Sequence, residues 1–216
     1  MDENQKLRRE LYNEMHDVAK AREAYSFIMG EGIPSVGPLN AGGQQLKDGI
    51  YIVYQDGSYA LFDGTNTISS AARIGVVMGE KRLCMSFRDI DDICLTNKED
   101  KTEYDGYISD WDSAVADWNG QKNTEHIKAI GTDIELEDGE WIPSLGEAYL
   151  LFINKKRINE ALKYLGQPEL EDEWYWVSTE GSANGAWSLH FTYGTFSYDN
   201  KSTYSFRVRP VSAWPR

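Results

Sequence analysis

Histidine and cysteine side chains and paired carboxylates could carry chemistry in this sequence, but their spacing matches no known catalytic pattern. The three histidines, His16, His126 and His190, are isolated along the chain, and no HExxH, GxSxG or P-loop pattern occurs. A catalytic zinc centre or a serine-hydrolase triad is therefore hard to assemble from them. We expect no catalytic residue, no bound metal and no cofactor.

Acidic pairs offer another route to acid–base chemistry. Asp91-Asp92 and the run from Glu169 to Glu173 could supply the two carboxyl groups of a glycoside hydrolase. In a chain with 35 acidic residues, such pairs are expected from composition alone. A non-enzymatic protein is therefore the leading hypothesis, and a glycosidase remains an alternative.

The two cysteines, Cys84 and Cys94, lie ten positions apart without a CxxC motif or a neighbouring histidine. A disulfide or a metal pair would be the more specific interpretation of this pair. The spacing favours two buried, reduced thiols that act as small apolar side chains.

Composition and charge restrict the class of partner. A hydrophobic content of 41% predicts one folded domain, and a net charge of −13 repels phosphate backbones and anionic lipid. No apolar run reaches the ~20 residues that span a bilayer, and the N-terminus lacks the apolar core of a signal peptide. We expect neither nucleic acid nor membrane as a partner, and synthesis in the cytoplasm.

The N-terminal region is predicted to be separate from the main domain. From Glu3 to Ile28, apolar residues recur at helical spacing without Gly or Pro, which predicts an amphipathic helix. This helix could lie on the following domain or form a coiled-coil stem that joins protomers, for example three of them. A Gly- and Pro-rich linker follows, so we divide the chain into residues 1–45 and 46–216.

Two tight turns predict β-hairpins at the start of the main domain. Asp56-Gly57 separates two runs rich in Tyr, Ile and Val, and Gly79-Glu80 separates the next two apolar runs. The acidic stretch from Asp89 to Asp110 is predicted as a loop.

Helices are predicted in the middle of the chain. "DWDSAVADW" and "NTEHIKAI" have the pattern of short helices, the second capped by Asn123 or Thr124. Ser144 and Glu147 form a capping-box pattern for a third helix, and Gly166 marks the end of a fourth. Because the remainder is predicted as strand and loop, the order of elements indicates an α+β fold.

The C-terminal stretch "GAWSLHFTYGTFSYDNKSTYSF" alternates apolar and polar residues, which predicts strands with one core face and one outward face. The expected structural frame consists of Trp176, Trp187, Leu189, Phe191, Phe196 and Val208. The expected ligand contacts are Gly181, Gly185, Ser188, His190, Thr192, Tyr193, Thr195, Ser197, Tyr198, Asp199, Ser202, Thr203, Tyr204 and Ser205. A solvated strand face would carry Lys and Glu, whereas Tyr with Ser, Thr and Gly is typical of binding loops. An exposed face of unusual composition without a ligand is the other interpretation.

Several segments together carry a resemblance to a known family. They are "DGIYIVYQDGSYALFDG", "ARIGVVM", "DWNGQKNTEHIKA", "IPSLGEAYLLF", "INEALKYLG", "WYWVSTEGSANGAWSLHF" and "KSTYSFRVRPV". Over about residues 47–214 the chain resembles the variable proteins of diversity-generating retroelements, the family that includes the major tropism determinant. That resemblance implies a C-type-lectin-like fold for residues 46–216, with a variable region at about 181–206.

The resemblance also implies how the residues of this surface are diversified and what they bind. Error-prone copying of adenines in such systems turns AAC-type codons into codons for many residues, but never for Lys, Glu, Gln, Met or Trp. Between Gly181 and Phe206 the unreachable types are Trp187 and Lys201, both in the fixed part of the family pattern. The family further implies a phage virion protein at a tail-fibre tip, often a trimer, that binds a host cell-surface protein or glycan. A fixed adhesin or lectin on a bacterial cell surface is the alternative.

Overall fold

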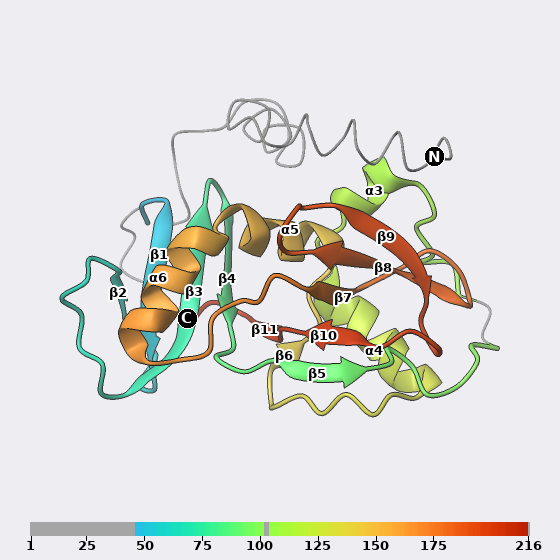
Figure 1. Ribbon diagram of the computed structural model, residues 1–216, viewed down its shortest axis with the longest axis horizontal. Coiled ribbons are helices and arrows are strands. Elements are labelled where there is room, and N and C mark those ends of the chain that lie inside the picture. Colours follow the sequence, from blue (N-terminus) through green and yellow to red (C-terminus); the bar gives the residue numbers. More distant parts are fainter. Residues whose placement is uncertain (1–45, 102–103, 216) are drawn as a thin grey trace.

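The protein is described by a computed structural model that covers residues 46–101 and 104–215 and contains two β-sheets with helices between and beside them (Figure 1). The helix and linker predicted within residues 1–45 lie outside the described residues. The division of the chain at residue 45 therefore stays a prediction.

The first sheet has six strands in the order β2-β1-β3-β4-β11-β6, and each neighbouring pair is antiparallel. Its strands are β1 (Gly49–Tyr54), β2 (Tyr59–Leu61), β3 (Ala71–Met78), β4 (Lys81–Met85), β6 (Glu140–Trp141) and β11 (Val211–Ser212). Both predicted hairpins are confirmed: Gly57 and Gly79 have φ of 81° and 57°, a left-handed conformation that favours glycine.

The second sheet has five strands in the order β5-β10-β7-β8-β9, and only the β10–β7 pair is parallel. Its strands are β5 (Ile90–Ile93), β7 (Trp174–Glu180), β8 (Gly185–His190), β9 (Phe196–Asn200) and β10 (Phe206–Val208). The prediction of a continuous loop from Asp89 to Asp110 was wrong, because β5 lies within it and pairs with β10.

Two sequence-adjacent strands at the C-terminus belong to different sheets. β10 pairs in the five-stranded sheet and β11 in the six-stranded sheet, so the chain crosses between them at Arg209 and Pro210. Arg209 is buried there, and its Nε donates to Asp89 Oδ1 at 2.5 Å. Val208 and Val211 thus lie on two short strands of different sheets.

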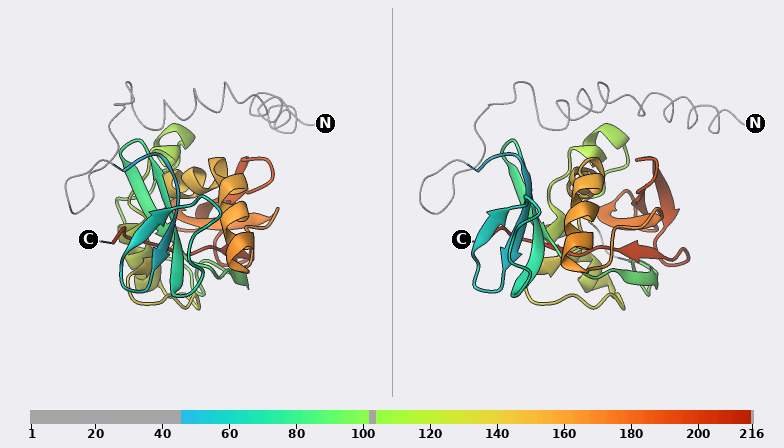
Figure 2. Two further views of the ribbon diagram at one scale, coloured as in Figure 1. Left: turned by 90° about the vertical axis from the view of Figure 1, so that its left-hand side faces the viewer. Right: turned by 60° about the vertical axis from the view of Figure 1, so that its left-hand side comes forward.

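The helices are α3 (Trp111–Val115), α4 (Gly120–Ile130), α5 (Leu145–Ile153) and α6 (Lys155–Leu165). α5 and α6 lie between the two sheets, and α5 contacts strands of both (Figure 2). The mainly β architecture with few helices agrees with the predicted α+β class. No helix among the described residues has the length and apolarity to cross a membrane.

The ends of the helices test the capping predictions. Ser144 and Glu147 form the predicted capping box at α5, and Gly166 ends α6 in the left-handed conformation. The predicted cap of α4 was wrong, because this helix begins at Gly120 and both proposed cap residues lie inside it. Asn123 instead donates to the carboxylate of Asp117.

Both cysteines are free thiols, as predicted, but only Cys84 is buried. Burial raises the pKa of the Cys84 thiol to about 12, which makes it unreactive at neutral pH. Cys94 is partly exposed and lies 3.6 Å from the hydroxyl of Ser205, so the prediction of burial was wrong for this residue.

Candidate ligand-binding surface

The strand register divides the five-stranded sheet into two faces. On the inner face, which packs toward α5, Tyr175 and Phe196 flank Leu189. On the outer face Trp174 lies opposite His190. α4 covers the end of this outer face that carries Trp176 and Ala186, where Ile127 packs against them. The other end, around Trp174 and His190, is partly exposed.

Five aromatic rings form a continuous row across the open end of the outer face, in the order Tyr193, His190, Trp174, Phe206 and Tyr204. Successive ring centroids are 4.9, 4.9, 5.9 and 6.1 Å apart. The terminal tyrosines are 44% and 53% exposed, and the three middle rings are half-buried. We call these five side chains the aromatic row.

Sequence reasoning found three members of the aromatic row and missed two. Tyr193, His190 and Tyr204 were among the expected contacts, whereas Trp174 and Phe206 were not. Trp174 precedes the expected segment, and its place is set by pairing with β8. The sequence does contain a signal for Trp174: it lies two positions before Trp176, so in a strand both side chains lie on the same face.

Ser188, predicted to point outward toward a ligand, is fully buried, so that prediction was wrong. Trp176 and Ser197 flank it on the neighbouring strands, and its hydroxyl donates to Asp199 Oδ2 at 2.8 Å. Ser188 can therefore orient the partly exposed carboxylate of Asp199 but cannot contact a ligand directly.

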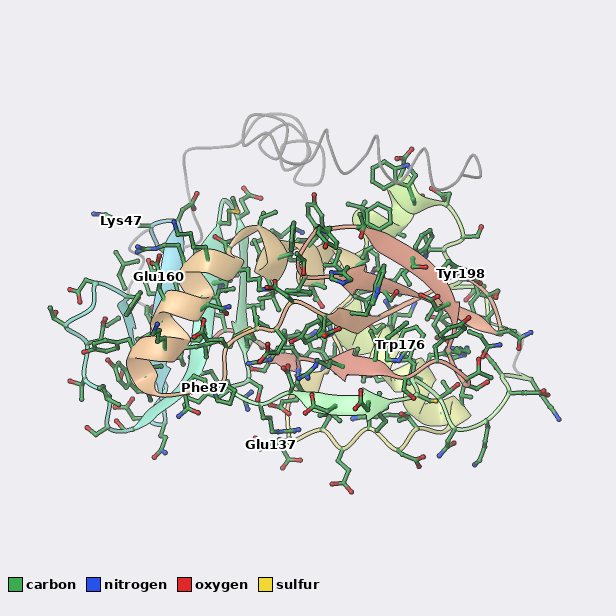
Figure 3. The ribbon with its side chains drawn as sticks, in the orientation of Figure 1. Lys47, Phe87, Glu137, Glu160, Trp176 and Tyr198 are labelled. Carbon is green, nitrogen blue, oxygen red and sulfur yellow. The ribbon has the colours of Figure 1, made fainter. Side chains whose placement is uncertain are left out.

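Tyr198, an expected ligand contact, is 45% exposed, but the strand register places it on the same face as Trp187 and Phe196. It pairs with Trp187, with 5.6 Å between the ring centroids. Tyr198 lies on β9, the edge strand of this sheet, and is labelled in Figure 3. Its ring covers Gly181 and Gly185, where a Cβ atom would come within 2.4 and 2.3 Å of ring carbons. Both glycines are buried, so they leave room for the Tyr198 ring and do not contact a ligand directly.

The remaining predicted residues follow the expected division more closely. The exposed contacts are Thr192, Thr203 and Ser205, and the half-buried ones are Thr195, Ser197, Asp199 and Ser202. The buried frame residues are Trp176, Trp187, Leu189, Phe191 and Val208, whereas Phe196 is only partly buried. Phe196 stacks on the exposed ring of Trp111 from α3, with 5.2 Å between centroids.

The electrostatic surroundings of the aromatic row are mainly acidic. Burial lowers the pKa of His190, and the nearby carboxylates of Glu173 and Asp172 oppose this shift. The imidazole is therefore neutral at pH 7 and presents a ring face rather than a charge. This combination suits a ligand that stacks on rings and hydrogen-bonds to hydroxyls.

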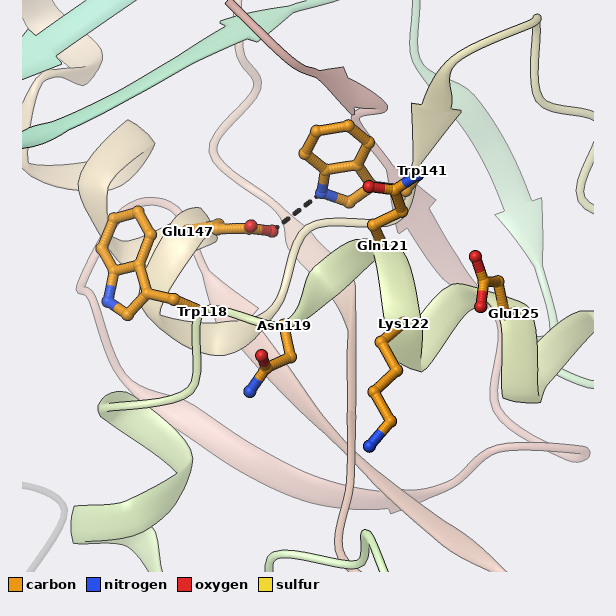
Figure 4. A pocket seen from close by; sticks show the side chains of 7 residues that line it. All are labelled: Trp118, Asn119, Gln121, Lys122, Glu125, Trp141 and Glu147. Carbon is orange, nitrogen blue, oxygen red and sulfur yellow. Dashed lines mark hydrogen bonds between the residues drawn. The ribbon is translucent and has the colours of Figure 1, made fainter.

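A pocket of about 400 Å³ lies apart from these strands, between α4, β6 and α5 (Figure 4). Glu147 lines it, but its Oε2 accepts hydrogen bonds from Trp141 Nε1 and from the Ser144 backbone N–H. Burial raises the pKa of Glu147. Because this carboxyl group belongs to the cap of α5, it has a structural use that requires no catalysis.

A second hollow of about 590 Å³ lies beside α6 and the end of β8, and Thr192 contributes to its wall. Lys155 is fixed there by the backbone carbonyls of Glu171 and Phe191 and by Asp172 Oδ1 at 2.5 Å. The Asp172 side chain is 74% exposed, so this ion pair is in contact with water.

The covered end of the outer face holds an unusual group of charges, which we call the buried charge centre: Asp100, His126, Glu180 and Lys201. Lys201 Nζ contacts Glu180 Oε1 and lies 3.5 Å from Asp100 Oδ2. His126 Nδ1 lies 2.5 Å from Glu180 Oε2, and its Nε2 lies 3.6 Å from Asp100 Oδ2. The side chains of Lys201, Asp100 and Glu180 are at most 1% exposed.

Comparison with known proteins gives one informative result for the fold. A solved structure of a fimbrial protein from Bacteroides ovatus ATCC 8483 is similar to this chain with a TM-score of 0.57 and 14% sequence identity. The match covers 77% of this chain and 48% of that one, so this chain spans about half its length. No protein-family model and no curated protein matches the sequence. The chain therefore shares its fold with a fimbrial protein.

Proposed function

We propose that this chain is a non-enzymatic binding protein that acts at a surface and recognises a host cell-surface protein or glycan. The observation that carries the proposal is the aromatic row, whose terminal tyrosines are exposed and are next in sequence to the exposed hydroxyl residues Thr192, Thr203 and Ser205. Rings offer large contact area at low entropic cost, and hydroxyls adapt their hydrogen bonds to the ligand. Neither requires a catalytic group or a cofactor.

The finer proposal is a variable protein of a diversity-generating retroelement with a C-type-lectin-like fold, carried at a phage tail-fibre tip. Its support lies in the burial of Trp187 and Lys201, the two residues between Gly181 and Phe206 that adenine-directed copying cannot produce. The exposed residues of that segment are of types that such copying can produce. In a diversified protein, we expect selection to keep residue types that this copying cannot produce in the core and to allow residue types that it can produce at the surface.

The gene neighbourhood tests this finer proposal. We expect a near-repeat of the coding segment for residues 181–206 beside a reverse-transcriptase gene, differing where the repeat has adenines. Absence of such a repeat would favour a fixed adhesin or lectin on a bacterial cell surface. The shared fold with a fimbrial protein supports that second candidate. In both cases we propose a homo-oligomer, with the N-terminal helix predicted for residues 3–28 as a stem that joins three protomers and so adds avidity.

Substitutions in the aromatic row test the binding role itself. Tyr193→Ala and Tyr204→Ala remove exposed rings, so we expect the melting temperature to change by only a few degrees. Each should weaken binding to host cells or to an immobilised glycan array by about 2 kcal/mol or more, as for an aromatic residue that carries much of the binding energy. Differential scanning fluorimetry and a cell-binding titration provide the two measurements.

Two controls separate loss of binding from loss of folding. Leu61→Ala removes a side chain of similar exposure, 43%, from the other sheet and should leave both measurements unchanged. Trp187→Ala opens a cavity in the core and should cost about 3–5 kcal/mol of stability. Equal destabilisation by Tyr193→Ala, Tyr204→Ala and Trp187→Ala, or equal binding loss in Leu61→Ala, would contradict the proposed surface.

A further inference from the structure

Lys201 is placed at the turn after β9 with its amine inside the protein. Its side chain is 1% exposed, and Nζ contacts Glu180 Oε1 while lying 3.5 Å from Asp100 Oδ2. Both carboxyl groups are equally buried. Removal of charged groups from water is costly, and their mutual attraction offsets only part of that cost. A reaction that removes the charges would release this energy.

A bound metal ion is a poor explanation for this group. Oxygen and nitrogen atoms of Asp100, His126 and Glu180 lie within 4.8 Å of one another, which is compatible with a metal site. Lys201 Nζ, however, contacts Glu180 and approaches Asp100, so a cation already faces both carboxylates. An ammonium group repels a metal ion and cannot act as its ligand while protonated.

We propose that Lys201 and Asp100 react to form an intramolecular amide bond, with Glu180 as the proton carrier. The Lys201 ammonium gives one proton to the Glu180 carboxylate, and the neutral amine attacks the Asp100 carboxyl carbon to form the C–N bond. Glu180 returns its proton to the departing oxygen, which leaves as water after taking a second proton from the nitrogen. One ammonium and one carboxylate thus become one amide and one water, without an oxidant or an external reactant.

The surrounding groups fit these roles. Glu180 contacts Lys201 through Oε1 and His126 through Oε2, so it lies between the proton donor and a second proton-carrying group. Tyr107 donates a hydrogen bond to Asp100 Oδ2, which stabilises negative charge on that oxygen during attack. Tyr104 stacks on the His126 ring with 3.7 Å between centroids and shields it from water.

Burial distinguishes this pair from an ordinary ion pair. Amide formation in water is disfavoured, but two reactants held ~3–3.5 Å apart in a dry site have a high effective concentration. Lys155 and Asp172 lie closer together, with 2.5 Å between Nζ and Oδ1, but the carboxylate is 74% exposed. Contact of the Asp172 carboxylate with water should keep this pair ionic.

The bond would connect two segments that are 101 positions apart in sequence. Lys201 follows β9 within the segment 181–206, and Asp100 precedes α3. The amide would anchor the end of the proposed ligand-binding segment to the body of the domain. Formation of this bond does not depend on any ligand.

Intact mass spectrometry of the purified, denatured full chain tests the proposal. We expect a mass lower than the sequence mass by one water molecule, and a branched proteolytic peptide that joins Lys201 to Asp100. Glu180→Gln keeps both reactants and removes the proton carrier, so most of that variant should have the full mass. Lys201→Arg keeps the charge but cannot form this amide, so the variant should have its full mass with no branched peptide.

The Lys155–Asp172 pair is the internal control, and its peptides should be unbranched in the same digest. A wild-type chain of full mass without the branched peptide would overturn the proposal, even if the variants fail to fold. A branch between Lys201 and Glu180 would overturn the assigned roles. A water loss that maps elsewhere in the chain would overturn it as well.

Discussion

The two ends of β7 lie on the same face of one sheet and have opposite characters. At the start of the strand, Trp174 belongs to the aromatic row, which is partly exposed and contains no charged side chain. At its end, Glu180 belongs to the buried charge centre. Seven residues of one strand thus connect a partly exposed row of aromatic rings with a buried group of charges.

This difference explains the low charge of the segment 181–206. Its one cation, Lys201, is inside the protein and pairs with acidic groups, whereas the exposed positions use Tyr, Ser and Thr. The segment therefore combines exposed Tyr, Ser and Thr side chains with one buried cation. A comparison of substitutions at the two ends should show whether binding and stability are as separate as the geometry suggests.

The largest effect is expected at the buried end. Lys201→Met leaves Asp100 and Glu180 buried without the amine that pairs with them and that is proposed to bond to Asp100; loss of one partner of a buried ion pair alone costs about 3–5 kcal/mol. Urea denaturation at pH 7 measures the change in unfolding free energy. A cost below about 1 kcal/mol would show that the centre is as tolerant as the exposed end, which would break the comparison.

The elements that could be predicted from sequence depend on interactions between near neighbours. The Asp56-Gly57 turn, the capping box of Ser144 and Glu147, and the left-handed Gly166 each join residues within a few positions. Their geometry is set by local hydrogen bonds and allowed backbone angles, and a single sequence contains that information.

The elements that could not be predicted depend on distant pairing. β5 forms only because β10 lies beside it, and the buried charge centre brings together Asp100 and Lys201 across 101 positions. Alternation along β8 correctly separated Trp187 from His190, but it could not show that neighbouring strands bury Ser188. Sheet order and the covering helix decide which outward residues reach solvent.

An intermediate effect is expected where the exposed segment rests on the body of the domain. In Gly185→Ala, the new Cβ would lie 2.3 Å from the Tyr198 ring, so the ring must move. Overpacking of this kind costs about 1–3 kcal/mol. The measurement is chemical denaturation of the single variant and of the Tyr198→Ala and double variants.

The double variant provides the control, because Tyr198→Ala removes the ring that obstructs the new methyl group. Gly185→Ala should then cost much less than in the wild-type background, and the difference is the coupling energy. Equal costs in both backgrounds would mean that Tyr198 is not seated on Gly185. The two positions would then affect stability independently.

The smallest effect is expected for the exposed ion pair that serves as the counterpart of the buried charge centre. The hydrogen bond from Lys155 holds the pKa of Asp172 below its usual range. The pair therefore contributes stability above the unfolded-state pKa of about 3.9 and loses it as pH falls through the lower folded-state pKa. Exposed pairs contribute about 0–1 kcal/mol, so Asp172→Asn should cost less than this at pH 7. Urea denaturation should find the variant and the wild type converging at a pH below the folded-state pKa of Asp172, where its carboxyl is protonated in both folded and unfolded chains. A difference in unfolding free energy that persists unchanged at that pH would arise from the side-chain amide of the asparagine rather than from charge. The Lys155–Asp172 pair could then not serve as the exposed reference for the effect of burial at Lys201.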